Sequence, residues 1–408
     1  MITERIRKML FNLGMLLALS GLALSRAMIS IGMGLIVLQA FLHPHPRQCI
    51  RAFLQNKSFL FPTLLFFIFL ISGLWSENLP YFVSKMQVKL PFLLLPYAFF
   101  TAPQMTKRKV HSFLAFFLLL ISVLSLLSLS NYALHYQALT ASYLEAKTLK
   151  VPFNHIRFSL MLSFSALIAF YLYREKVRLF VKWEPRFYLA VSIFLFIFLH
   201  ILSVRSGLLS FYLGAAWMLI LYIRQSRNQK KASLLLLLLI VVPILAYLTV
   251  PTFQNKIKYM IHDLEHYSAG NDISRFSDSR RLSSWEAGIA VGNRSPLTGA
   301  GYGDFKDEIY HYYAREIPAF DPDTYIIPHN QLILTYSATG LFGLLLFIVF
   351  LLYPVFNKKA YRFYPFALIN IIIWSSFMVE PTLEIQIGTA FYLLFFLLTL
   401  KAQAPECP

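Results

Sequence analysis

The stretch "LLLLLLIVVPILAYLTV", residues 234–250, carries no charged side chain and decides the fold class. A helix of about 20 apolar residues crosses the roughly 30 Å hydrocarbon core of a bilayer. Further stretches of similar length recur along the 408 residues, of which 58% are hydrophobic and only 14% are charged. Because a helix satisfies its own backbone hydrogen bonds in lipid, these repeated stretches predict an all-α integral membrane protein.

We predict about twelve transmembrane helices, with a large polar loop before the tenth. The chain is expected to divide into transmembrane helices over 1–250, an outer loop with short helices over 251–329, three further transmembrane helices over 330–400 and a tail over 401–408. The basic start also resembles a signal peptide, but a second apolar segment follows at once and favours a retained first helix. The expected helices lie near 9–24, 27–42, 58–75, 90–102, 110–132, 156–173, 187–203, 207–223, 233–250, 330–353, 363–380 and 386–400.

Membrane topology explains the net charge of +18 better than nucleic-acid binding does. Most of the 37 Lys and Arg residues fall in short loops on one side of the expected helices, as the positive-inside rule requires. This pattern places both termini in the cytoplasm and the loop 251–329 on the outer face. The two cysteines, Cys49 and Cys407, have no spacing typical of a disulfide framework or a metal site.

The outer loop contains a stretch that combines cationic, aromatic and glycine residues, "SDSRRLSSWEAGIAVGNRSPLTGAGYGDF" at 277–305. It predicts a short helix between two turns. Arg281, Trp285 and Gly288 recur at helical spacing, so they share one face of that helix. The glycine run "GAGYG" at 299–303 suits an anion-binding nest of backbone amides, but it lacks the strand–turn–helix context of a dinucleotide site.

Two polar positions stand at the outer boundary of the expected lipid region. "PHNQLILTYSATGLFG" at 328–343 places His329 and Asn330 at the mouth of an apolar helix. Histidine has an ordinary pKa of about 6.5 and suits general base catalysis near neutral pH, although an interfacial histidine also simply bonds a backbone carbonyl. Arg205, in the short turn "SVRSG", is either a site residue at membrane depth or a snorkelling arginine at a helix end.

These residues resemble the bacterial O-antigen ligase family. His329 and Asn330, nine intervening residues, then Gly340 and Gly343 follow its H-[NSQ]-x9-G-x-x-[GTY] pattern. "SVRSGLL", "RRLSSWEAGI" and "SPLTGAGYGDF" agree with further motifs of that family, and the resemblance covers roughly residues 150–400.

The resemblance implies a glycosyltransferase of the bacterial inner membrane, with the outer face as the periplasm. It would move a glycan from undecaprenyl diphosphate to a hydroxyl of lipid A–core. Its implied catalytic residue is His329, and the diphosphate would be bound by Arg205 and Arg281, with the adjacent Arg280 as an alternative to Arg281. The expected supporting residues are Asn330, Arg157, Lys85 and Lys89, the two lysines lying just outside the third and fourth helices.

We expect no metal or other cofactor. The first outer turn, "SRA" at 25–27, holds no carboxylate, and the acids at 304–323 lack an EF-hand spacing. Planar, permanently charged guanidinium groups would neutralise the diphosphate instead. Glu380 is expected to pair with one of these arginines. The tyrosines at 302–325 either stack on sugar faces or cover the loop's own small core.

Three functions stay open at this point. The first is an O-antigen ligase, and the second is an O-antigen polymerase or a protein O-oligosaccharyltransferase with the same donor. A polymerase needs a second basic groove, for which Lys85, Lys89 and Arg157 are available. The third is a lipid-linked glycan transporter, which the lack of a charged path through the expected helices disfavours. The expected partners are the lipid-linked donor, the acceptor and membrane lipid, without nucleic acid.

Overall fold

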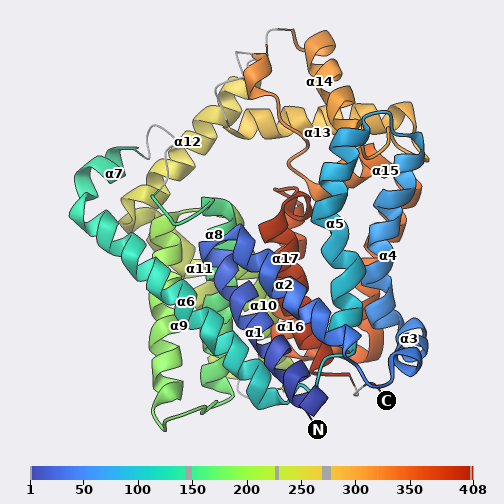
Figure 1. The fold of residues 1–408 in the computed structure, drawn as a ribbon. Coiled ribbons are helices and arrows are strands. Elements are labelled where there is room, and N and C mark those ends of the chain that lie inside the picture. Colours follow the sequence, from blue (N-terminus) through green and yellow to red (C-terminus); the bar gives the residue numbers. More distant parts are fainter. Residues whose placement is uncertain are drawn as a thin grey trace. The chain divides into compact units, whose positions relative to one another are not determined.

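The computed structural model describes residues 2–142, 149–225, 229–268, 277–318, 320–404 and 407 (Figure 1). Every regular element among these residues is a helix, which confirms the predicted all-α class. The chain divides into two compact units, and the first contains Met1–Met105, His262–Tyr361 and Phe377–Pro408. The second unit contains Thr106–Ile261 and Arg362–Ser376.

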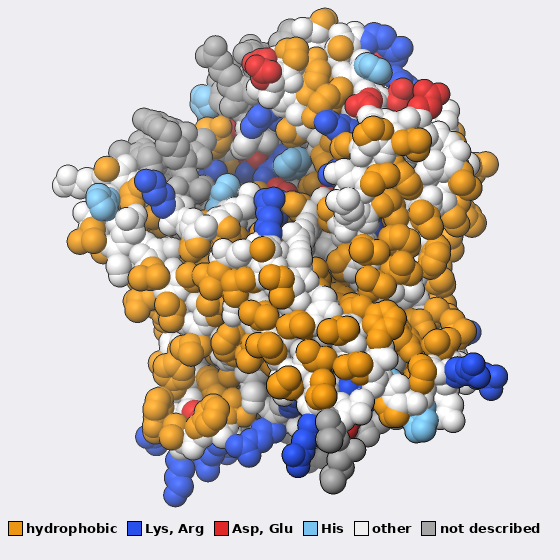
Figure 2. Space-filling model, viewed as in Figure 1, with side chains coloured by type: hydrophobic (Ala, Val, Ile, Leu, Met, Phe, Trp, Pro, Cys, Tyr) orange, Lys and Arg blue, Asp and Glu red, His pale blue; other side chains and the backbone are white. Residues whose placement is uncertain are grey.

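Fewer helices qualify as membrane spans than the sequence predicts. Within the described residues, seven helices are long and apolar enough to cross a membrane, and an eighth span results if a pair bent by 111° is one span. Hydrophobic side chains cover much of the visible surface in Figure 2, as lipid contact requires. The prediction of about twelve spans is therefore supported for seven or eight. The seven spans are Thr3–Leu24, Lys57–Trp75, Lys107–Leu134, His155–Arg174, Glu184–Leu202, Arg205–Arg224 and Gln331–Phe356.

The first unit packs its helices around α5 and α4. Helix α1 lies along α2, α4 packs between α5 and α15, and α17 packs on α5. Two short 3₁₀ turns, η1 (Gly73–Trp75) and η5 (Thr382–Glu384), follow α4 and precede α17. The helices of this unit are α1 (Ile2–Leu24), α2 (Arg26–Phe41), α3 (Pro46–Gln55), α4 (Lys57–Ser72), α5 (Leu79–Phe100), α13 (Ser277–Arg294), α14 (Phe305–Glu316), α15 (Gln331–Phe356) and α17 (Gln386–Lys401).

The second unit is organised around α8. In the most apolar window of α8, 83% of the residues are buried, and α6, α9 and α10 all pack on this helix. Helix α12 (Pro251–Ser268) starts in the second unit, and its residues from His262 belong to the first. The other helices of this unit are α6 (Lys107–Leu134), α7 (Tyr136–Ser142), α8 (His155–Arg174), α9 (Glu184–Leu202), α10 (Arg205–Gln225), α11 (Gln229–Thr249) and α16 (Tyr364–Phe377).

The helix expected at 90–102 starts much earlier, at Leu79. The Asn78 side chain accepts a hydrogen bond from the backbone amide of Tyr81 at 3.1 Å and so caps the first turn. Lys85 and Lys89 consequently lie inside α5, and the prediction that they stand outside the helices is wrong.

Helix α3 is not predicted by hydropathy, because it is short and carries cations on its exposed side. It is amphipathic: Cys49 and Phe53 are buried, whereas Arg47 and Arg51 are exposed. Cys49 forms a disulfide with Cys407, a pairing that the sequence spacing does not indicate. The disulfide ties α3 to the end of the described chain.

Helix α15 is broken at Gly340, where φ is +65° and ψ is −171°. The break frees backbone groups on both sides. Two amides of the glycine run, those of Ala300 and Gly301, donate to the carbonyls of Ser337 and Ala338 at 2.9 and 3.0 Å. Beyond the break, the amide of Leu341 donates to the carbonyl of Pro296 at 2.8 Å. The loop 296–301 therefore replaces the helical hydrogen bonds that the break removes.

We expect Gly340→Ala to destabilise the first unit by at least about 3 kcal/mol, because only glycine adopts this backbone conformation readily. A Cβ at this position would also lie 2.3 Å from the carbonyl carbon of Leu297. The measurement is thermal unfolding of the purified protein in detergent. Gly34→Ala is the matched control, because a Cβ there meets no atom within 4 Å. Equal melting temperatures for the two variants would contradict the prediction.

Candidate active site

Helix α13 is anchored at its start by a buried carboxylate from α12. The two oxygens of Asp263 accept hydrogen bonds from the backbone amides of Asp278 and Ser279 at 2.7 and 3.1 Å. The Ser279 hydroxyl also donates to Asp263. A carboxylate at a helix N-terminus satisfies amides that have no partner within the helix. Of the interval predicted as the outer loop, residues 269–276 and 319 lie outside the described residues.

One face of α13 holds the segment that leads into α15. The indole Nε1 of Trp285 donates to the carbonyl of His329 at 3.1 Å, and the amide of His329 donates to the Ser284 hydroxyl at 3.1 Å. At Gly288 a Cβ would lie 2.6 Å from Pro328, so only glycine permits this close approach. The predicted shared face of Arg281, Trp285 and Gly288 is thus the face that positions His329.

The imidazole of His329 and the guanidinium of Arg281 both approach the carboxylate of Glu380. The Nδ1 of His329 lies 3.3 Å from Oε1 of Glu380, within ion-pair distance although the atoms are not aligned for a hydrogen bond. The same carboxylate oxygen lies 3.4 Å from the guanidinium of Arg281, which confirms the predicted pairing of Glu380 with an arginine. Side-chain exposure is 24% for His329, 27% for Arg281 and 11% for Glu380, so solvent reaches the base while the carboxylate is mostly covered. The other terminal nitrogen of the Arg281 guanidinium lies 3.8 Å from a carboxylate oxygen of Asp278.

Asn330 acts as the N-cap of α15. Its side-chain oxygen accepts from the amides of Leu332 and Ile333 at 2.9 and 3.2 Å, and its Nδ2 donates to the carbonyl of Met378 at 3.4 Å. Asn330 therefore fixes the start of α15 and connects it to the turn that carries Glu380. This contact pattern supports a positioning role for Asn330.

A buried ionic network lies directly beyond Asn330. The ammonium of Lys89 is fully buried and lies 2.6 Å from Glu384, whose other oxygen accepts from the Tyr302 hydroxyl at 2.6 Å. Gln331 donates to Glu384 at 3.2 Å and accepts from the amide of Leu383 at 2.9 Å. Burial alone would raise the pKa of Glu384, but the Lys89 charge and these hydrogen bonds hold it below its ordinary value.

This network favours a structural role for Lys89 over the expected contact with phosphate. Its ammonium also donates to the carbonyl of Leu383 at 2.9 Å, so it binds α5 to η5, the turn before α17. Lys85, one turn earlier in α5, is half-buried and lies 5.4 Å from the centre of the Tyr81 ring. Of the two lysines, Lys85 is the one whose charge reaches solvent.

We expect Lys89→Met to lower the free energy of unfolding by about 3–5 kcal/mol, because it leaves the Glu384 carboxylate buried without its counter-charge. The double variant Lys89→Met/Glu384→Gln should recover most of that loss. Lys85→Met is the control and should change stability by less than about 1 kcal/mol. Chemical denaturation of the three variants in detergent measures these differences. A loss for Lys85→Met as large as that for Lys89→Met would contradict the assignment.

Arg280 is half-buried, and its Nε atom has no hydrogen-bond partner among the described residues. The guanidinium of Arg281 is paired with the Glu380 carboxylate, and that of Arg280 is not. Arg281 lies beside the His329–Glu380 pair, whereas Arg280 has a buried Nε without a partner in the described part of the chain.

The other two arginines lie in the second unit. Arg205 is the first residue of α10, after a turn in which Ser203 adopts φ +54°. A Cβ on Gly207 would lie 2.5 Å from Ser159, so the first turn of α10 packs closely on the first turn of α8. Arg157 belongs to that turn of α8. The structure therefore brings Arg157 and Arg205 to the same end of the second unit.

Four of the five backbone amides of the glycine run, residues 299–303, donate within the protein, which disfavours the anion-binding nest. Besides the amides of Ala300 and Gly301, which serve α15, the amide of Gly299 donates to Ser295 and that of Gly303 to Ser76, at 2.8 and 2.9 Å. The loop's tyrosines mainly form its core: Tyr313 is buried, with ring-centre distances of 5.1 Å to Phe320 and 4.9 Å to Tyr325. Of the two roles left open for these rings, the structure favours packing.

Among the described residues, one group of His, Cys, Asp or Glu side chains is close enough together to hold a metal ion. The group found within the described residues is His43, Cys49 and Cys407, whose ligand atoms lie within 4.8 Å of one another, and its two sulfurs form the disulfide. Among the acids at 304–323, the Asp304 carboxylate accepts from the amides of Glu77 and Asn78 at 2.8 and 2.7 Å. Metal-independent transfer stays a prediction.

The segment that contains His329 and Arg281 is similar to a known protein family. Residues 190–348 match the family described as O-Antigen ligase. This match supports the O-antigen ligase family for that region of the chain. The matched O-antigen ligase region includes Arg205, Arg281 and His329, and the family assignment indicates a bacterial membrane glycosyltransferase of the ligase/polymerase type. A search of curated proteins found no match.

The O-antigen ligase motif thus has a structural explanation for each of its fixed positions. His329 carries the imidazole that faces Glu380, and Asn330 caps the helix. Gly340 breaks α15 to receive the loop 296–301, and a Cβ on Gly343 would lie 2.2 Å from the Thr339 hydroxyl and 3.3 Å from Ile68 of α4. The predicted packing role of the two glycines holds, although the partner at Gly340 is a loop and not a helix.

Proposed function

We propose that this protein is an O-antigen ligase that moves a glycan from undecaprenyl diphosphate to a hydroxyl of lipid A–core, on the periplasmic face of the inner membrane. The observation that carries the proposal is the convergence of His329, Glu380 and Arg281 at the start of α15. Transfer from a diphosphate needs a base for the acceptor and positive charge for the leaving group, and this cluster would supply both.

In this proposal each nitrogen of His329 has its own role. Because Nδ1 faces Glu380, the acceptor hydroxyl would lose its proton to Nε2. The acceptor oxygen then forms a bond to the anomeric carbon, while the bond from that carbon to the diphosphate oxygen breaks. Undecaprenyl diphosphate leaves with the electron pair, and this single displacement inverts the anomeric centre. Glu380 would stabilise the imidazolium that forms.

Guanidinium groups would stabilise the departing diphosphate without a metal ion. Arg281 and Arg205 match the family arginines, and Arg280 adds a third cation with an unsatisfied Nε. Bidentate guanidinium–phosphate contacts are stronger and more directional than contacts of a point charge. The leaving group therefore experiences positive charge in the transition state, where it lowers the barrier.

The burial of Lys89 weakens the case for a polymerase. A polymerase binds two lipid-linked substrates, and Lys89 was one of three cations available for a second groove. Its ammonium is occupied by Glu384, which leaves Lys85 and Arg157. The base–carboxylate pair beside a cation likewise favours an enzyme over a transporter. We therefore retain the polymerase and the protein O-oligosaccharyltransferase as outcomes of the test.

The test is transfer by the purified protein from a lipid-linked glycan to lipid A–core in excess chelator. We expect glycosylated lipid A–core and free undecaprenyl diphosphate at a rate that added magnesium does not change. Longer lipid-linked chains without modified lipid A–core would identify a polymerase, and glycosylated protein would identify the protein-modifying relative. Inhibition by chelator with recovery in magnesium would overturn the metal-independent mechanism.

A further inference from the structure

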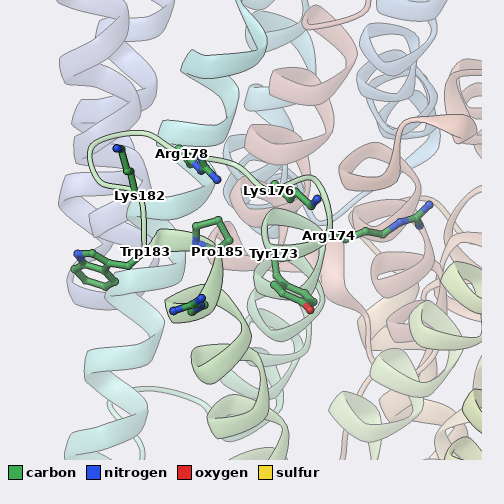
Figure 3. Close-up of a pocket in the computed structure, with 8 residues that line it drawn as sticks. Tyr173, Arg174, Lys176, Arg178, Lys182, Trp183 and Pro185 are labelled. Carbon is green, nitrogen blue, oxygen red and sulfur yellow. The ribbon is translucent and has the colours of Figure 1, made fainter.

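The loop between α8 and α9 holds a concentration of positive charge that the proposed transfer reaction does not use. Four cationic side chains, at Lys176, Arg178, Lys182 and Arg186, are exposed, and none has an ion-pair partner among the described residues. Together with Tyr173, Arg174, Trp183 and Pro185 they line a hollow of about 630 Å³ (Figure 3). This hollow lies entirely within the second unit.

The backbone of this loop is held in place from inside. The carboxylate of Glu184 accepts hydrogen bonds from the amides of Leu179, Phe180 and Val181 at 2.5, 2.6 and 2.8 Å. Arg108 of α6 donates to the carbonyl of Leu179 at 2.7 Å. The buried carboxylate of Glu184 therefore accepts hydrogen bonds from the loop backbone. Glu175 is the other acid of the loop. The backbone of the loop is therefore fixed, and its four exposed cations, Lys176, Arg178, Lys182 and Arg186, project from it without ion-pair partners in the described part of the chain.

Apolar side chains on the same loop are exposed beside the cations. Phe180 is 89% exposed and Trp183 is 60% exposed, and Figure 3 shows Trp183 next to Lys182. Both helices that the loop joins qualify as membrane spans, so the loop lies where hydrocarbon gives way to lipid headgroups. Aromatic and cationic side chains together are suited to that boundary.

We propose that this hollow binds the headgroup of an anionic phospholipid, with the phosphate held by Lys176, Arg178 and Lys182 and the acyl chains beside Phe180 and Trp183. The positive charge of the lining favours an anionic ligand. The loop connects two membrane spans, and this position favours a lipid headgroup over a soluble phosphate. The proposed lipid site shares no residue with the His329 cluster and does not rest on the proposed transferase activity. Positive charge that serves topology alone would not need an organised hollow.

The experiment is native mass spectrometry of the purified full chain titrated with phosphatidylglycerol and with phosphatidylcholine. We expect preferential retention of phosphatidylglycerol. The variant Lys176→Gln/Arg178→Gln/Lys182→Gln should lose that preference on the order of 100-fold, since each cation near a membrane surface contributes about five-fold. The matched control Arg47→Gln/Arg51→Gln/Lys57→Gln removes three exposed cations elsewhere and should keep it.

Equal losses in the two triple variants would show that only diffuse charge acts and would overturn the proposal. Unchanged preference in the loop variant would do the same. Displacement of phosphatidylglycerol by millimolar inorganic phosphate would show a general anion site instead of a lipid site. Transfer activity is not the readout, so the outcome is independent of the proposed ligase reaction.

Discussion

His329→Ala is expected to lower glycan transfer by about 10³-fold, the range in which a general base contributes. The fold should persist, because α13 holds this position through the backbone: the amide and carbonyl of His329 contact Ser284 and Trp285. The variant should therefore insert and melt like the unmodified protein. Transfer rates of the purified variants, normalised to folded protein, measure the effect.

Glu380→Gln should lower the same rate by a smaller factor, on the order of 10- to 100-fold, because it keeps the shape of the side chain but removes the charge that stabilises the imidazolium. The acceptor KM should change little, since Glu380 contacts the base and not the acceptor. This difference separates a positioning and electrostatic role from loss of structure.

His311→Ala is the matched control for the histidine. His311 is exposed on α14, in the same outer interval, and should be replaceable without effect on transfer. Asn330→Ala should instead lose about 1 kcal/mol of stability as a helix-cap variant. Full transfer activity in His329→Ala, with His311→Ala equally active, would refute the assignment of the base.

Local sequence patterns account for the parts of the site that depend on one helix. The spacing of Arg281, Trp285 and Gly288 predicts a shared face, and that face meets the segment carrying His329. The N-cap role of Asn330 was also readable, since asparagine directly before an apolar run is a helix-start signal. The family resemblance implies only a supporting role at this position and does not indicate the cap.

The remainder depends on contacts between distant segments. Lys89 and Glu384 are 295 positions apart, and neither local sequence shows that the two charges are buried together. The motif glycine Gly340 indicates close packing, but its partner, the loop 296–301, is fixed only when the break in α15 exposes free carbonyls. Periodicity carries no information about either pairing. The short amphipathic α3 escaped prediction for a different reason, because its cations mask its apolar side in a hydropathy average.

Arg281→Ala is expected to lower transfer by about 10²- to 10³-fold, the range for removing one transition-state charge donor. The guanidinium lies 3.4 Å from the carboxylate that faces His329, so its loss acts beside the reacting atoms. Arg280 is not paired with that carboxylate, and we expect Arg280→Ala to act mainly on the donor KM. Comparing the two variants decides which of the adjacent arginines stabilises the leaving diphosphate, a choice that the sequence leaves open.

Arg205→Ala should cause a loss similar to that of Arg281→Ala if both guanidinium groups bind the diphosphate. Arg281→Lys should recover only part of the activity, because lysine keeps the charge without the planar pair of donors. Arg294→Ala is the control on the same helix: Arg294 forms an exposed ion pair with Glu308 at 2.6 Å, and such pairs contribute little. Kinetics against donor concentration separate kcat from KM. If Arg281→Ala and Arg294→Ala reduced transfer equally, the charge of Arg281 would have no specific role in stabilising the leaving diphosphate, and the mechanism would need another cation.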